Sequence, residues 1–155
     1  MSDQPWHETV SLPALLRHAR TTYAEAMRRA LDEAGYDDIP GNGLYIIGGL
    51  ALGEGGVPIG QLVHELGITK QGAGQLVDTL VLRGYLARTA DEADRRQLIV
   101  TLTERGRAAA ATQTAGREAV DAQLLAAVGS DDVAAARRSL AALIDIRRAV
   151  PAAEG

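Results

Sequence analysis

Apolar residues recur every three or four positions along much of the chain, which is the spacing of amphipathic helices. A first run of this kind follows Ser11, a residue suited to begin a helix, and stops at Gly35, a residue suited to end one. The pattern therefore predicts a helix over residues 11–35. The next apolar stretch, "LYIIGGLAL", fits either a buried helix or a strand, and its helical surroundings favour the helix.

Two shorter helices are predicted next. Pro58 suits the first turn of one helix and Gly67 its end, with Ile59, Leu62, Val63 and Leu66 facing inward. Thr69 is a candidate N-cap for the following helix, which ends at Gly84. The apolar positions of that helix lie on one face: Ala73, Leu76, Val77, Leu80 and Val81. Two short helices at this spacing predict a helix-turn-helix.

After Gly84 the helical period gives way to alternation. "YLART" and "QLIVTL" predict two strands, and the polar stretch "ADEADRR" between them predicts a hairpin tip. Long helices are expected from Thr103 to about Val128 and from Ser130 to about Val150. The expected fold class is mainly α with a small β-hairpin wing, in a single domain of residues 1–155.

Composition narrows the class of protein. The 155 residues include no cysteine, which excludes disulfides, thiol redox chemistry and thiolate metal sites. No uninterrupted apolar run is long enough to span a bilayer, and the N-terminus lacks the pattern of a secretory signal. We therefore expect a cytoplasmic protein without a membrane partner.

Charge is distributed unevenly along the chain. The formal net charge is −4, yet residues 69–107 carry seven basic and five acidic side chains, and the segments on either side are net negative. Local charge decides binding more than the total, because exposed charges farther apart than about 10 Å are screened. The basic segment is thus the candidate for contact with an anionic partner.

Gly72 and Gly74, in "ITKQGAGQLVDTLV", could belong to a phosphate-binding loop or to a helix. A dinucleotide-binding loop needs a third glycine where Val77 stands and a preceding strand, and a Walker loop needs a Gly-Lys-Ser/Thr end; none of these is present. The pair is therefore assigned to a helix. There the glycines either leave Gln71 and Gln75 on a narrow ridge that fits a groove, or are tolerated surface residues.

The stretches "IGQLVHELGITKQGAGQLVDTLVLRGYLART" and "DEADRRQLIVTLTERGR" together resemble the MarR family of bacterial transcription regulators. In that family an Asp, one residue and an Arg precede an alternating strand and a Leu-Thr-x-x-Gly entry into a long helix. Asp94, Arg96, Leu102, Thr103 and Gly106 stand at those places, and the close match covers about residues 57–108. The resemblance implies a winged helix-turn-helix lobe, residues 57–102, between long dimerisation helices at 11–35 and 103–150.

The resemblance also implies a function. Members of the family are homodimers whose two winged helices each bind half of a pseudo-palindromic operator in double-stranded DNA, so a transcriptional regulator, and more specifically a repressor, is expected. The helix from Thr69 would enter the major groove and the wing the neighbouring minor groove. The implied DNA-binding residues are Thr69, Lys70, Gln71, Gly72, Gly74, Gln75, Arg88, Asp94, Arg95 and Arg96.

Individual roles follow from the matched positions. Arg96 would be the wing-tip arginine in the minor groove, with Asp94 orienting it through an ion pair and Arg95 on a phosphate. An arginine is favoured in a narrow A·T-rich minor groove, and glutamine pairs well with the edge of adenine. The alternative for the two arginines is a solvated hairpin tip. Relatives often carry Ser or Thr where this chain has Gly72 and Gly74, which leaves the base-reading set open.

Many members of the family release DNA when a small aromatic acid or phenolic effector binds between the dimerisation helices and the winged helix. By resemblance the polar candidates for such a cleft are Arg17, His18 and Tyr45. The alternative is that Tyr45 is a core residue and Arg17 a charge on the dimer face.

No enzyme, cofactor or metal site is expected. The serines lie at a terminus, at helix starts or on a helix, none in a nucleophile elbow, and the three histidines are far apart in sequence. The rival to a DNA-binding regulator is a winged helix that serves as a protein-interaction module without DNA binding. Asp78 and Leu82 favour the rival, whereas Lys70, Arg88, Arg95 and Arg96 favour DNA.

Overall fold

The computed structural model describes residues 4–52 and 57–150. The chain consists of two compact units, Met1–Arg117 and Glu118–Gly155. The first unit contains the winged helix. The expected organisation into one domain with dimerisation helices stays a prediction.

The first unit begins with helices. A four-residue helix α1 (Trp6–Thr9), which the sequence pattern did not predict, precedes α2 (Leu12–Glu33). Ser11 has the extended backbone of an N-cap but its side chain makes no capping hydrogen bond, and Gly35 ends the helix with a φ of 87°. The helix predicted over residues 11–35 is confirmed.

Helix α3 (Gly43–Leu52) is the apolar stretch whose sequence fitted a helix or a strand. Leu44, Ile46, Ile47 and Leu50 are all buried, so the helix is covered on more than one side and has no need of a polar face. The prediction of a buried helix is confirmed.

The helix-turn-helix consists of α4 (Ile59–Leu66) and α5 (Lys70–Leu82). Gly67 ends α4 in the left-handed conformation, with a φ of 61°, which glycine adopts without a Cβ penalty. Thr69 caps α5 as predicted, because its hydroxyl accepts a hydrogen bond from the Gly72 amide at 3.0 Å. Ala73, Val77 and Leu80 are buried, whereas the burial of Ile59, Leu62 and Leu66 lies outside what the structure describes.

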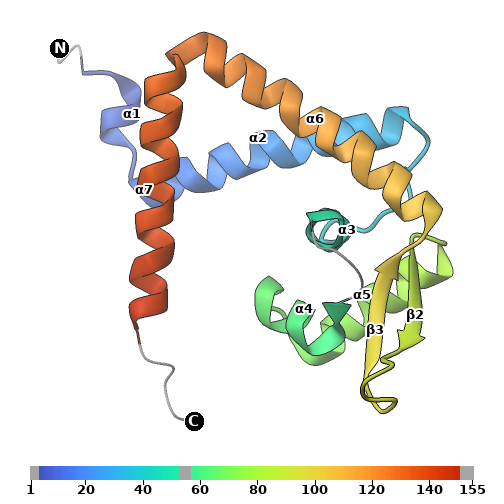
Figure 1. Cartoon of the computed structure of the whole chain (residues 1–155). Coiled ribbons are helices and arrows are strands. Elements are labelled where there is room, and N and C mark those ends of the chain that lie inside the picture. The colour runs from blue at the N-terminus through green and yellow to red at the C-terminus, as the bar shows by residue number, and fades with distance from the viewer. Residues whose placement is uncertain (1–3, 53–56, 151–155) are drawn as a thin grey trace. The chain divides into compact units, whose positions relative to one another are not determined.

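The wing belongs to an antiparallel sheet of three strands in the order β1-β3-β2. The two predicted strands are present as β2 (Leu86–Ala90) and β3 (Leu98–Leu102), and β3 runs directly into α6 (Figure 1). The third strand, β1 (Val57–Pro58), was missed because two residues carry no alternation. Pro58 is therefore not in the first turn of α4: it pairs with Ile99 and forms the N-cap.

Helix α6 (Glu104–Val128) begins against the winged helix. The Thr103 hydroxyl accepts from the Gly106 amide at 3.0 Å and donates to the Gly84 carbonyl at 2.5 Å. A Cβ on Gly106 would overlap the carbonyl oxygen of Tyr85. The glycine in this "LTERG" entry is thus required by the close approach of the first helical turn to the backbone of Tyr85.

One hydrophobic core holds the first unit together. It draws on α2, α3, α5, the sheet and the start of α6, and its members are Leu31, Ile39, Leu44, Ile46, Ile47, Leu50, Val77, Leu80, Tyr85, Leu86, Val100, Ala109 and Ala110. Farther along, α6 packs closely on α2, since a Cβ on Gly116 would lie 3.0 Å from the Ala26 carbonyl oxygen. The core therefore supports the winged helix from the side of the long helices.

The second unit holds the rest of α6 and α7 (Ser130–Ala149), both predicted from the sequence. Gly129 joins them with a φ of 85°. No residue of α7 is buried within the chain. Large apolar side chains of both helices are exposed: Leu124, Leu125 and Val128 on α6, and Leu140, Leu143, Ile144 and Ile146 on α7. None of the described helices is long and apolar enough to cross a membrane.

Candidate nucleic-acid interface

The first turn of α5 presents polar side chains to solvent. Thr69, Lys70, Gln71 and Gln75 are all exposed, and the apolar stripe of the helix faces the core. The amphipathic pattern thus orients the helix with its polar residues outward. The arrangement leaves this turn of α5 accessible to a macromolecule.

Gly72 and Gly74 lie inside α5, as predicted, but their surroundings differ. A Cβ on Gly72 would sit 3.1 Å from the Thr69 hydroxyl that caps the helix, which is a crowded contact. A Cβ on Gly74 would meet nothing within 4 Å. Only Gly74 therefore leaves open space beside the exposed glutamines.

Gln75 has a neighbour that sequence reasoning did not anticipate. Together with Gly72 it lines a hollow of about 450 Å³ between α5 and the connector that precedes α3. Pro40, Gly41 and Asn42 form the other wall. Gln75 thus lies near the connector as well as on the exposed face of the helix.

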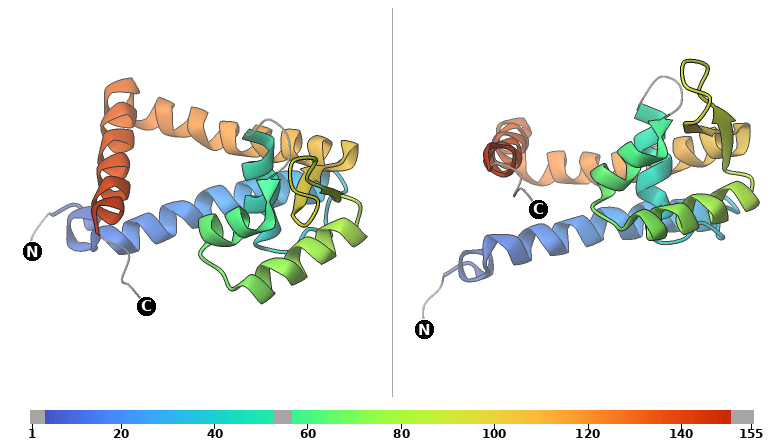
Figure 2. Two further views of the ribbon diagram at one scale, coloured as in Figure 1. Left: turned by 60° about the horizontal axis from the view of Figure 1, so that its bottom comes forward. Right: turned by 90° about the horizontal axis from the view of Figure 1, so that it is seen from below.

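Asp94 contacts both the backbone and the side chain of Arg96 at the wing tip. Asp94 accepts a hydrogen bond from the Arg96 amide at 3.1 Å, and its carboxylate lies 3.7 Å from the Arg96 guanidinium Nε. The Arg96 side chain is 97% exposed. Arg95 is also exposed and, within the described part of the chain, makes no hydrogen bond or ion pair. The tip stands away from the helices in Figure 1 and in the right-hand view of Figure 2.

Lys70 and Arg96 come together although they are far apart in the sequence. Both line a hollow of about 640 Å³ between the wing and the helix-turn-helix, with Gly60, Val63, Gln97 and Leu98. One cation comes from the first turn of α5 and the other from the wing tip. Two converging cations on one concave surface create a local positive potential that attracts an anionic partner.

Arg88 has a different environment. Its guanidinium forms an ion pair with the Asp78 carboxylate on α5, and the Arg88 side chain is 30% exposed. The pair links the wing strand β2 to α5. Sequence reasoning named Arg88 but missed its link to Asp78, since nothing in the spacing of the two residues indicates that the strand returns along α5.

Among the described residues, no hydrogen bond, ion pair or ring contact joins the three effector candidates, Arg17, His18 and Tyr45, to one another. The hydroxyl of Tyr45 accepts from the Arg20 guanidinium at 3.0 Å, and that guanidinium lies 4.6 Å from the centre of the Tyr45 ring. Arg17 and His18 are exposed on α2. Arg20 was missed because it is one helical turn from Arg17 and equally polar, so the sequence offers no way to choose between them.

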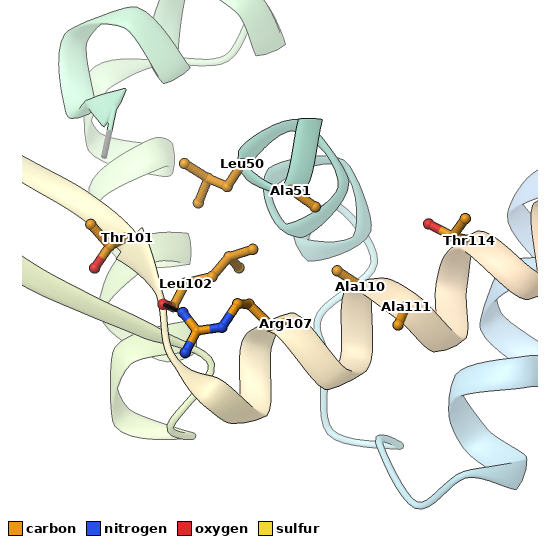
Figure 3. A pocket seen from close by; sticks show the side chains of 8 residues that line it. All are labelled: Leu50, Ala51, Thr101, Leu102, Arg107, Ala110, Ala111 and Thr114. Carbon is orange, nitrogen blue, oxygen red and sulfur yellow. Dashed lines mark hydrogen bonds between the residues drawn. The ribbon is translucent and has the colours of Figure 1, made fainter. Parts of the chain in front are cut away.

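A larger hollow, of about 700 Å³, lies between the end of α3, β3 and the first turns of α6 (Figure 3). Leu50, Ala51, Leu102, Ala110 and Ala111 supply most of its lining, and Thr101, Arg107 and Thr114 are its polar members. The Arg107 guanidinium donates to the Leu102 carbonyl at 3.0 Å. The site combines apolar walls with one cation. Among the described residues, no three His, Asp or Glu side chains gather to hold a metal ion.

The helix-turn-helix, the paired hairpin and the long flanking helix define a winged helix-turn-helix protein. Residues 37–97 match a family model described as the MarR family. A comparison with curated protein sequences finds no match.

Solved structures share the fold over most of the chain. The transcriptional regulator Tm0710 from Thermotoga maritima is 25% identical, with a TM-score of 0.57, over 88% of this chain and 93% of its own. FabT from Streptococcus pneumoniae in complex with DNA is 19% identical, with a TM-score of 0.75, over 88% and 95%. The S. aureus MepR–DNA complex is 16% identical, with a TM-score of 0.72, over 88% and 98%.

Proposed function

We propose that this protein is a homodimeric transcription regulator that binds a pseudo-palindromic operator in double-stranded DNA, and that it acts as a repressor. The observation that carries the proposal is the convergence of Lys70 and Arg96 on one hollow between the start of α5 and the wing. A duplex presents a phosphate backbone between adjacent grooves. A helix in one groove and a wing in the next would enclose that backbone between these two cations.

Roles are assigned by exposure. Gln71 and Gln75 are exposed on α5 and suit the adenine edge in the major groove, while Thr69 and Lys70 suit phosphates. Arg96, oriented by Asp94, suits the minor groove, and the exposed Arg95 suits a phosphate. Arg88 would act through its ion pair with Asp78, which holds β2 and α5 together. FabT and MepR, which share the fold, were each solved in complex with DNA.

Fluorescence anisotropy with a labelled duplex tests the proposal. The duplex would come from the region directly upstream of the gene, with a scrambled duplex of the same composition as control. We expect tight binding to the first duplex alone, with log affinity falling steeply as log salt rises, because several phosphates are neutralised. Weak binding to both duplexes with a flat salt response would favour the protein-interaction alternative.

Homodimerisation is supported by the second unit. The apolar side chains of α6 and α7 stand exposed in the single chain, and surfaces of this kind mark association sites. Leu143→Glu should halve the mass measured by light scattering, because it places a charge among them. Leu82→Glu, which changes a leucine 87% exposed on the winged lobe, should leave the mass unchanged. A monomeric wild type would contradict the proposal.

A small acid is the effector class that the Arg107 hollow supports. Its volume of about 700 Å³ lies within the usual range for ligand pockets, about 300–1,000 Å³, and its one cation would pair with a carboxylate. The alternative effector site is a cleft lined by Arg17, His18 and Tyr45. Benzoate titrated by calorimetry distinguishes the two: Arg107→Gln abolishes binding in the first case and Tyr45→Phe weakens it in the second. No heat with the wild type would contradict both.

A further inference from the structure

Three polar side chains meet where the winged helix joins the long helices. They are Asp38 from the connector after α2, Tyr85 from the turn between α5 and β2, and Arg105 from the first turn of α6. The Tyr85 hydroxyl donates to the Asp38 carboxylate and accepts from the Arg105 guanidinium at 3.0 Å. Arg105 lies 3.5 Å from the same carboxylate, which closes a triangle that we call the junction triad.

The surroundings of the junction triad restrict its movement. Tyr85 is fully buried, and the Arg105 guanidinium lies 4.6 Å from the centre of its ring. Tyr36 packs edge-on against Tyr85, with ring centres 6.2 Å apart. Arg83, the C-cap of α5, donates to the Asp38 carbonyl. Groups from the connector after α2, from the end of α5 and from the start of α6 therefore converge on one buried phenol.

The ionisation of the junction triad suits this arrangement. The hydrogen bond from Tyr85, aided by the Arg105 charge, lowers the pKa of Asp38 below its ordinary value. Burial, and then the bond to Asp38, raises the pKa of Tyr85. The carboxylate is therefore ionised and the phenol protonated across the neutral range, which is the pairing that the hydrogen bond requires.

The junction triad lies at the C-terminal end of α5, so a small change of angle there would displace the exposed N-terminal end of the helix by a larger distance. The thirteen residues of α5 rise about 20 Å from the triad end to Lys70. A tilt of about 10° at the triad would move that first turn by roughly 3.5 Å, close to the rise of one base pair, about 3.4 Å. A tilt of that size at the triad would therefore shift the exposed end of α5 by about one base pair.

We propose that Asp38, Tyr85 and Arg105 are positioning residues that fix the angle of α5 against α2 and α6, and so set the operator half-site spacing that the dimer accepts. The inference rests on the proposed function. The triad touches no DNA: its effect is on which spacing is selected, through the direction in which each α5 projects.

A spacing series tests the inference. Affinity would be measured for duplexes in which the two half-sites are moved apart or together by one base pair, and for a single half-site. Wild type should lose about 10–100-fold in affinity at the altered spacings, the usual range for a mismatched site. Tyr85→Phe, which removes the hydroxyl and keeps the ring, should reduce that discrimination to about threefold and leave single half-site affinity unchanged.

Tyr36→Phe is the matched control. It removes a hydroxyl from the neighbouring ring, and that hydroxyl makes no hydrogen bond to any described residue. Discrimination should stay at the wild-type level. If Tyr85→Phe also keeps it, the triad is structural only and the inference is overturned. Where Tyr85→Phe does not fold, Asp38→Asn takes its place, because the amide still accepts from the phenol but lacks the charge.

A second readout separates this inference from the proposed function. The chain has no cysteine, so spin labels can be placed at Glu25→Cys on α2 and Gln71→Cys on α5, diluted with unlabelled protein. Tyr85→Phe should broaden the distance distribution in the free protein. An unchanged width contradicts the inference whether or not DNA binds. Wild type that binds no duplex, with a broadened variant, contradicts only the DNA function and the spacing role built on it.

Discussion

The wing tip and the junction triad each contain an aspartate and an arginine at nearly the same separation, 3.7 Å for Asp94 and Arg96 and 3.5 Å for Asp38 and Arg105. At the wing both side chains stand in solvent, where an ion pair contributes little to folding. At the junction a buried tyrosine hydroxyl lies between them and connects three segments. The same pair of residues is thus free to bind a ligand in one place and committed to the architecture in the other.

The contrast follows from the backbone. Arg96 sits on a polar hairpin tip, whose sequence supplies no apolar surface to cover it. Arg105 sits one residue before Gly106, at the turn where α6 approaches Tyr85. The Tyr85 hydroxyl is buried, although the Arg105 and Asp38 side chains are 47% and 40% exposed, so water competes less for these hydrogen bonds than for an ion pair wholly in solvent. Four changes test the contrast.

The largest effect is expected from Gly106→Ala. The added Cβ overlaps the Tyr85 carbonyl oxygen, and the strain should cost about 3 kcal/mol or more of unfolding free energy. For a chain of this length the Tm should fall by roughly 6–12 °C, measured by circular dichroism. Gly74→Ala, where nothing lies within 4 Å, should be neutral or slightly stabilising. Equal Tm values for the two variants would show that the junction is not tightly packed.

Arg96→Ala should act on binding and spare folding. We expect operator affinity to fall by about 10–100-fold, equivalent to about 1–3 kcal/mol, because the proposed minor-groove contact would be lost. The Tm should move by no more than about 2 °C, since the side chain is 97% exposed. Arg96→Lys, which keeps the charge, separates electrostatic from shape readout. Operator affinity equal to wild type would remove Arg96 from the interface.

Acid should weaken the junction triad. Because the folded pKa of Asp38 lies below its ordinary value of 3.8, its stabilising contribution is present above that pH and is lost as pH falls through the folded pKa. The Tm difference between wild type and Asp38→Asn should therefore be constant from pH 7 to about 5 and shrink below about 4. A difference that grows on acidification would reverse the sign of the argument.

The smallest effects are expected from Gly72→Ser and Gly74→Ser. Gly72→Ser crowds the Thr69 cap and should lower the unfolding free energy by at most about 1 kcal/mol, with a slightly lower Tm. Gly74→Ser fills open space beside the glutamines and should change operator preference rather than Tm. If both variants keep wild-type affinity and sequence preference, the narrow-ridge hypothesis is wrong and the glycines are tolerated surface residues.

Much of this architecture could be predicted from the sequence. Helical periodicity located α2 and α5, the Thr69 cap was identified by residue type, and the "ADEADRR" stretch predicted the hairpin tip. The expected ion pair between Asp94 and Arg96 is present, while its role on DNA stays a prediction. These features share one property: each depends on residues close together in the chain.

What could not be predicted depends on distant residues. Arg20 beside Tyr45, Asp78 beside Arg88, and the junction triad join side chains from separate elements, so no local spacing reveals them. The strand β1 has the same origin, since two residues form it only because β3 lies alongside. Tertiary pairing selects among many equivalent polar residues, and one sequence alone does not show which is chosen.

Helix α7 buries none of its residues within its own chain, and an isolated helix of twenty residues is only marginally stable in water. In the proposed homodimer its folded form would draw stability from the second chain, and by mass action that stability would rise with the logarithm of protein concentration. Dilution should melt the C-terminal unit before the winged helix. In a cell that makes few copies of the proposed regulator, the protomers would be separated and unable to bind DNA, so abundance itself would serve as a threshold for repression.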